Sequence, residues 1–214
     1  MTSGRKRRRG ERRKSVRIFK GSILIVCEDS KCAPNYFKAL KKAWHADLVD
    51  IEVVIHGKEC GSDPIQVVNH AIDMYNDRKL EIRDPLSGKV QFDRVWCVFD
   101  NDNRETFRRA LEIIKHKKFL SSAESDPCFE LWYLCHFKVP RQNFHACSDV
   151  ERSLIQEMPD FERKSAPIDR LLPLINAAMK NAGVLRQEIE ENKNLDYSYT
   201  YIDLVVSDLR KLAR

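Results

Sequence analysis

Three short apolar runs, each followed by a stretch with helical spacing, constrain the fold of this 214-residue chain more than any other feature. The runs cover residues 22–27, 50–56 and 94–99 and are rich in valine and isoleucine. Runs of this length and composition are typical of strands buried on both faces of a sheet. Because helical segments follow each run, the pattern predicts an α/β fold with a parallel sheet flanked by helices.

The stretches between the runs carry apolar residues at helical spacing. In residues 32–44, Phe37, Leu40 and Trp44 fall on one face, and Pro34 suits a first helical turn. Thr200 and Asp203 have the spacing of a capping box before the last helix. We also expect a loop at 77–92, a short fourth strand at 119–122, and helices starting near 64 and at 104–117, 148–157, 167–181, 183–193 and 200–212.

Charge divides the chain into two unequal parts. The formal net charge is +6, but residues 1–20 alone carry ten basic side chains and one acid, or +9, which leaves −3 for residues 21–214. A charged segment with few apolar residues is typical of a disordered arm. Such an arm could bind a phosphate backbone, although a solvated tail or a nuclear-localisation signal would have the same composition. The candidate nucleic-acid contacts are Arg5, Lys6, Arg7, Arg8, Arg9, Arg12, Arg13 and Lys14.

Composition narrows the class of protein further. A hydrophobic fraction of 43% is sufficient for an ordinary core, and no apolar run approaches the ~18 residues of a membrane span. The basic N-terminus is not followed by an apolar segment, so we expect a cytoplasmic protein without a secretory signal. The expected organisation is a basic arm at 1–20, an α/β core at 21–126 and a helical C-terminal portion at 127–214 that packs on the core.

The seven cysteines are scattered and include no C-x-x-C pair. Zinc sites usually take ligands in pairs at short spacing. We therefore expect free thiols in a reducing compartment and no zinc site. Cys27 and Cys97 lie inside apolar runs and are expected to be buried as small apolar side chains.

Acidic residues follow two of the expected strands. Glu28 follows the first strand, and Asp100 and Asp102 follow the third. The carboxyl ends of parallel strands meet at one edge of a sheet, and alternate residues of an extended segment point the same way. Such a group of hard oxygen ligands favours Mg²⁺ or Mn²⁺. The sequence predicts a metal site here, and the alternative is that Asp102 or Asn103 caps the next helix.

Three other residues have two interpretations each. Lys31, at the start of the first helix, could contact a substrate phosphate or be a solvated surface lysine. Glu130 lies in the apolar run 128–137, where a buried carboxylate requires a partner. This partner could be the metal site, with Glu130 as an outer ligand, or a buried arginine or histidine. His136 is expected to be a buried, hydrogen-bonded histidine rather than a catalyst.

These residues belong to a longer pattern that resembles the RloB family. A glutamate after the first strand and D-x-D after the third also resemble the Toprim fold of topoisomerases, primases and related nucleases. The chain departs from the RloB pattern at Asp29, Cys32, Ala33, Asn103 and Asp126, and the missing acid at 33 leaves a one-metal site as the expectation. The matching segments are V-C-E at 26–28 with Lys31 and P-N-Y-F at 34–37, F-D-x-D at 99–102, and D-P-C-F-E-L-W at 126–132.

The resemblance implies a bacterial anti-phage effector that causes abortive infection. It implies a metal-dependent nuclease that cleaves RNA such as tRNA, with an ATPase encoded nearby as a candidate partner. A second copy of the chain is a further candidate partner, independent of the resemblance. The divalent ion would polarise the scissile phosphate, and Glu28 would be a ligand or a proton-transfer group. A DNA-nicking Toprim nuclease and a catalytically silent module that binds nucleic acid or the ATPase are the alternatives. The candidate catalytic residues are Glu28, Lys31, Asp100, Asp102 and Glu130.

Overall fold

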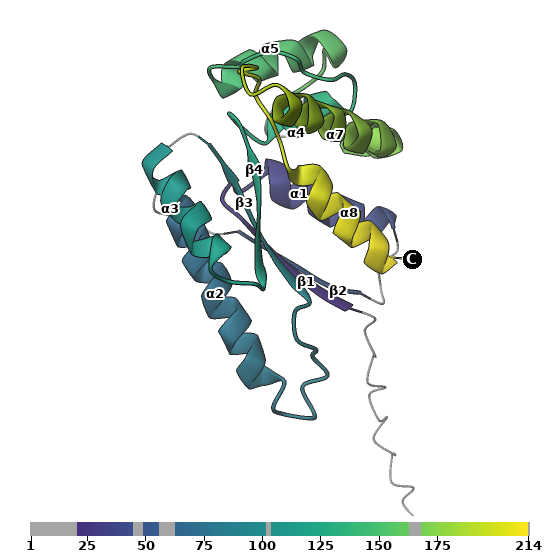
Figure 1. Cartoon of the computed structure of the whole chain (residues 1–214). Coiled ribbons are helices and arrows are strands. Elements are labelled where there is room, and N and C mark those ends of the chain that lie inside the picture. Colours follow the sequence, from purple (N-terminus) through teal and green to yellow (C-terminus); the bar gives the residue numbers. More distant parts are fainter. Residues whose placement is uncertain (1–20, 45–48, 56–62, 102–103, 163–167, 214) are drawn as a thin grey trace, which may run out of the picture.

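The computed structural model describes residues 21–44, 49–55, 63–101, 104–162 and 168–213. Its four strands are all parallel and form one sheet in the order β2-β1-β3-β4. Helices flank this sheet, which confirms the predicted α/β class (Figure 1). The strands are β1 (Gly21–Cys27), β2 (Val49–Ile55), β3 (Arg94–Asp100) and β4 (Leu120–Ser125).

The central strand β1 is buried on both faces because its two sets of alternating side chains enter two separate apolar clusters. Ile23 and Ile25 belong to the larger cluster, whereas Leu24 and Val26 belong to the smaller one. All four side chains are fully buried. This explains why the strand reads as a continuous apolar run rather than an alternating one.

The two faces of the sheet are covered by different helices. Helices α2 and α3 pack on the smaller apolar cluster, and α1 and α8 pack on the larger one (Figure 1). Asp63 starts α2 as its N-cap, since its carboxylate accepts the Ile65 N–H at 2.9 Å. The helices are α1 (Cys32–Ala43), α2 (Pro64–Glu81), α3 (Arg104–Lys115) and α8 (Ile202–Ala213).

The helical C-terminal portion continues the larger apolar cluster beyond the sheet. Side chains of α4, α5 and α7 share this cluster with β1 and α1. A bridge between Ser125 and Thr200 also ties the segment before α8 to the end of β4, and the two hydroxyl oxygens lie 2.8 Å apart. The remaining elements are α4 (Glu130–Cys135), α5 (Cys147–Glu157), α6 (Ile168–Leu171), the 3-10 helix η2 (Leu172–Leu174) and α7 (Ile175–Glu191).

Several expected boundaries were wrong. Helix α2 runs to Glu81, into the predicted loop at 77–92, and β4 extends to Ser125. Helix α7 passes through Gly183, where a break was expected; a helical glycine costs only about 1 kcal/mol. Asp203 does not complete the expected capping box, because its carboxylate accepts two hydrogen bonds from Arg186 at 2.7 and 2.8 Å.

No helix within the described ranges is long and apolar enough to cross a membrane. The expected basic arm at 1–20 lies outside the described residues. The domain boundary expected at residue 126 falls just after β4 and stays a prediction, as does the Toprim assignment of the sheet.

Candidate active site at the carboxyl edge of the sheet

Glu28 and Asp100 lie together because β1 and β3 are neighbours in the sheet. The Glu28 N–H donates to the Val98 carbonyl at 2.9 Å, which extends the pairing of the two strands by one residue. The Asp100 N–H then donates to Glu28 Oε2 at 3.0 Å. This bond fixes the orientation of a carboxylate that is only 6% exposed. Asp102 lies outside the described residues, so the D-x-D part of the site stays a prediction.

The start of α1 is occupied by a carboxylate of the chain itself. Asp29 accepts the N–H groups of Lys31, Cys32 and Ala33 at 2.5, 2.7 and 2.8 Å. These are backbone groups that have no partner within the helix, so Asp29 satisfies them. A substrate phosphate could reach them only by displacing Asp29. The Lys31 side chain is exposed at the same place, and its contact with a phosphate stays a prediction.

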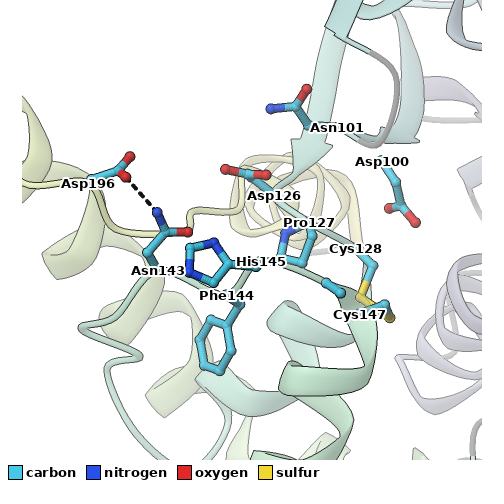
Figure 2. A pocket seen from close by; sticks show the side chains of 11 residues that line it. Asp100, Asn101, Asp126, Pro127, Cys128, Asn143, Phe144, His145, Cys147 and Asp196 are labelled. Carbon is cyan, nitrogen blue, oxygen red and sulfur yellow. Dashed lines mark hydrogen bonds between the residues drawn. A yellow bond between two sulfur atoms is a disulfide. The ribbon is translucent and has the colours of Figure 1, made fainter.

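Asp100 opens onto a pocket of about 470 Å³ where the sheet edge meets the segments before α4, α5 and α8 (Figure 2). Carboxylates of Asp100, Asp126 and Asp196 line it together with the His145 imidazole. No Lys or Arg of the described part of the chain is among its lining residues. The lining residues are Asp100, Asn101, Asp126, Pro127, Cys128, Asn143, Phe144, His145, Ala146, Cys147 and Asp196.

Hydrogen bonds between distant segments hold the pocket walls in place. The Asn101 N–H donates to the Ser125 carbonyl at 2.9 Å, and the Asp126 N–H donates to the Tyr199 carbonyl at 2.8 Å. On the opposite wall, Asn143 Nδ2 donates to Asp196 Oδ2 at 2.5 Å, the contact dashed in Figure 2. The pocket is therefore built from parts of the chain far apart in sequence.

Sequence reasoning missed most of this pocket. Asp126 was noticed only as a departure from a family motif, and Asn143, His145 and Asp196 lie in segments without helical or strand spacing. Motif 126–132 pointed to the right region, but no local signal connects it to residues 143–147 or 196. Glu28, in contrast, was singled out but does not line the pocket, because its carboxylate is buried behind the Asp100 backbone.

Glu130 is buried, with 2% of its surface exposed. The Cys32 thiol donates to its Oε1 at 3.2 Å, and the Cys147 sulfur lies 3.3 Å from its Oε2. The sequence led us to expect a metal ion, or a buried arginine or histidine, as the partner of Glu130. These two contacts with sulfur atoms were not expected. An additional role for Glu130 as an outer ligand or catalytic group stays a prediction.

The expectation of free thiols was wrong for two of the cysteines. Cys128 and Cys147 form a disulfide, because the turn before α4 and the start of α5 bring residues 19 positions apart into contact. Cys27 and Cys97 are free and fully buried, as expected. Burial raises the pKa of Cys97 to about 12, so this thiol stays protonated.

The prediction that His136 is a buried, satisfied histidine is confirmed. Its Nδ1 lies 2.9 Å from the Trp132 carbonyl, and its Nε2 lies 3.1 Å from the Tyr36 hydroxyl. A carbonyl can only accept, so Nδ1 carries the proton and Nε2 accepts from Tyr36. Burial lowers the pKa of His136 to about 4, which keeps the ring neutral at pH 7.

The fold and the site define an α/β protein with an acid-lined pocket at the carboxyl edge of a parallel sheet. The model of one protein family, RloB-like protein, matches residues 23–209. The chain therefore belongs to the RloB-like family, which confirms the resemblance seen in its motifs. No curated protein and no solved structure gives a significant match.

Proposed function

We propose that this RloB-like protein is a metal-dependent phosphodiesterase that cleaves nucleic acid, with RNA such as tRNA as the favoured substrate. The observation that carries the proposal is the contact between Glu28 and the backbone of Asp100 beside an acid-lined pocket. In open parallel sheets, this carboxyl edge is where functional groups gather. Membership of the RloB-like family supports our further proposal that the reaction serves bacterial anti-phage defence by abortive infection.

The side chains at this edge are of the chemical type that a hard divalent cation binds. Asp100 and Asp126 present carboxylate oxygens to the same pocket, and such ligands favour Mg²⁺ or Mn²⁺. Asp100 and Asp102 would hold the cation, and Glu28 would be a further ligand or a proton-transfer group. When bound, the cation would polarise the scissile phosphate and offset its developing charge.

The chain's own residues would do the remaining work. The hydrogen bond from the Asp100 N–H holds the Glu28 carboxylate in one orientation, which suits a ligand or a proton acceptor. An acid-lined pocket repels a phosphodiester unless a cation is present. Affinity for nucleic acid would then come largely from the ten basic residues of the arm at 1–20. The ATPase encoded nearby and a second copy of the chain stay candidate partners.

The decisive experiment compares RNA cleavage by the purified wild type with the variants Glu28→Gln and Asp100→Asn. Both variants keep side-chain size and remove one charge. We expect each to lower the cleavage rate by at least about 100-fold, since a metal ion contributes several kcal/mol and each 1.36 kcal/mol is tenfold. Removal of divalent cations with a chelator should have the same effect on the wild type.

Asp73→Asn is the matched control, because Asp73 is exposed on α2, on the other face of the sheet. Wild-type cleavage by Glu28→Gln would disprove the assignment. Nicking of a supercoiled plasmid without RNA cleavage would identify DNA as the substrate. Sequencing of RNA ends from cells that express wild type or Glu28→Ala would identify the target, and growth arrest by both proteins would indicate a binding module instead.

A further inference from the structure

Four side chains with metal-binding atoms meet behind one wall of the acid-lined pocket: Cys32, Cys128, Glu130 and Cys147, here called the Cys–Glu cluster. The Cys128 and Cys147 sulfurs and one Glu130 oxygen all lie within 4.8 Å of one another. Cys32 Sγ lies 3.2 Å from the other Glu130 oxygen. We propose that the Cys–Glu cluster, once its disulfide is reduced, binds a thiophilic divalent cation of the Zn²⁺ type.

The spacing between the Glu130 oxygens and two of the sulfurs already suits such a cation. Zn–S bonds of about 2.3 Å and Zn–O bonds of about 2.0 Å in a tetrahedron place sulfur and oxygen roughly 3.5 Å apart. The observed distances from Glu130 are 3.2 Å to Cys32 and 3.3 Å to Cys147. The bonded pair, Cys128 and Cys147, has to open to roughly 3.8 Å between sulfurs. Cys32 is not part of the group whose atoms all lie within 4.8 Å of one another, so its sulfur also has to move closer to join the same cation.

The contact between Cys147 and Glu130 favours the reduced, cation-bound form. A sulfur in a disulfide carries no hydrogen, so Cys147 cannot donate to the Glu130 oxygen that lies 3.3 Å away. In the disulfide form the contact joins two electron-rich atoms. In the reduced form, a thiol could donate across it, and a cation could bind both atoms at once.

The setting of the Cys–Glu cluster also matches a protein metal site. Cys128 and Glu130 are each 2% exposed and Cys32 is 7% exposed, whereas Cys147 is half-buried. A cation bound here would be largely shielded from water. The ligands come from three parts of the chain, the start of α1, the start of α4 and the start of α5. A cation would therefore join these three helices.

The chemistry of the cluster differs from that of the Asp100 site. Sulfur ligands select Zn²⁺ and related soft cations, whereas the oxygen ligands of the pocket select Mg²⁺ or Mn²⁺. Cys128 and Cys147 line the same pocket as Asp100, so the two sites would border one pocket (Figure 2). The proposal does not depend on nuclease activity.

Opening the site is a two-electron reduction. A phosphine reductant breaks the sulfur–sulfur bond and becomes a phosphine oxide; one water molecule supplies the oxygen and the two protons that the sulfurs take up. The cation then displaces protons from the thiols, and its affinity falls at low pH. The disulfide and the cation-bound form exclude each other.

The test titrates the full chain with Co²⁺ under anaerobic conditions, after reduction with a phosphine and removal of divalent cations. Co²⁺ replaces Zn²⁺ in tetrahedral sites and produces thiolate charge-transfer bands in the near ultraviolet. We expect these bands to saturate at one equivalent and to disappear when Zn²⁺ is added. Protein that keeps its disulfide should show no such bands.

Single serine variants identify the ligands. We expect Cys128→Ser and Cys147→Ser each to weaken Co²⁺ binding by more than about 100-fold, because loss of outer-shell partners alone costs roughly 10- to 100-fold. Cys32→Ser should lower the intensity of the charge-transfer band by one thiolate. Cys135→Ser is the control, since Cys135 is free, buried and outside the cluster.

Two results would overturn the proposal. One is the absence of thiolate bands in the reduced wild type, and the other is equal Co²⁺ affinity in the wild type and Cys147→Ser. Circular dichroism of each variant confirms that the fold is retained. Because Glu130 is buried among other core residues, the serine variants rather than Glu130→Gln decide the outcome.

Discussion

The two faces of the sheet are packed in different ways. The face covered by α2 and α3 is closed mainly by apolar side chains, such as Phe107, Ala110 and Ile114. Its buried Arg78 pairs with Glu52, a carboxylate that is 37% exposed. The opposite face, continued by α4, α5, α7 and α8, also buries polar groups, including His136 and Asp203, and each of these has defined partners. The polar face is also the one that contains the Cys–Glu cluster. The stability of the polar face should therefore depend more strongly on buried polar groups and on pH than that of the α2–α3 face.

The largest expected effect comes from breaking the buried ion pair of the polar face. Arg186 and Asp203 have side-chain exposures of 19% and 8%. Arg186→Met would leave the Asp203 carboxylate buried without its guanidinium, which should lower the free energy of unfolding by about 3 to 4 kcal/mol. Urea denaturation followed by circular dichroism measures this loss.

The matched control is Lys89→Met on the α2–α3 side. Lys89 and Glu81 form an ion pair with side-chain exposures of 44% and 45%, so its loss should cost less than about 1 kcal/mol. Equal losses for the two variants would show that burial does not make the Arg186–Asp203 pair more important than an exposed ion pair. The double variant Arg186→Met/Asp203→Leu should recover part of the loss, because no unpaired charge remains.

The next largest effect is a dependence of the free energy of unfolding on pH, caused by His136. Its pKa is lowered to about 4 in the folded protein by burial, from 6.5 in the unfolded chain. As the pH falls through 6.5, the unfolded state takes up a proton that the folded state does not bind, so stability is lost progressively between pH 6.5 and pH 4. We expect this loss to reach about 2 to 3 kcal/mol.

Denaturation of the wild type and His136→Gln over the same pH range isolates this contribution. Other groups titrate in both proteins; for example, burial raises the pKa of Glu124, which opposes the trend. The difference between the two curves removes these shared terms. Curves with the same slope would mean that His136 is not held neutral by the fold.

The smallest expected effect on stability comes from the removal of a single buried hydroxyl group on the polar face. Tyr36→Phe removes the O–H that donates to His136 Nε2, and loss of this buried hydrogen bond should cost about 1 kcal/mol. Tyr75→Phe is the control on the α2–α3 face, where Tyr75 stacks on Phe119 with ring centres 3.8 Å apart. This change keeps the ring and should alter stability by less than about 0.5 kcal/mol. Thermal denaturation of both variants checks the difference.

The sequence predicted the parts of the fold that depend on neighbouring residues. The strand at 22–27, the helix that follows it and the acids Glu28 and Asp100 were all readable because spacing and burial pattern repeat over a few residues. That Glu28 and Asp100 lie at the same edge of the sheet could be predicted because both follow parallel strands. Helix ends were predicted less well, as α2 and α7 show, because glycine and polar residues only weakly oppose a helix that packing stabilises.

Other features were decided only by the tertiary structure. The strand order β2-β1-β3-β4, the disulfide Cys128–Cys147 and the approach of Cys32 to Glu130 all join residues that are distant in the chain. Residues 32 and 130 are separated by 98 positions, and no local pattern records that the starts of α1 and α4 share one cluster. By itself, the sequence therefore determined most of the helices and strands and the presence of acidic residues at the carboxyl edge of the sheet. Packing of the helices on the polar face decided which side chains meet there, because burial brings them together regardless of their separation along the chain.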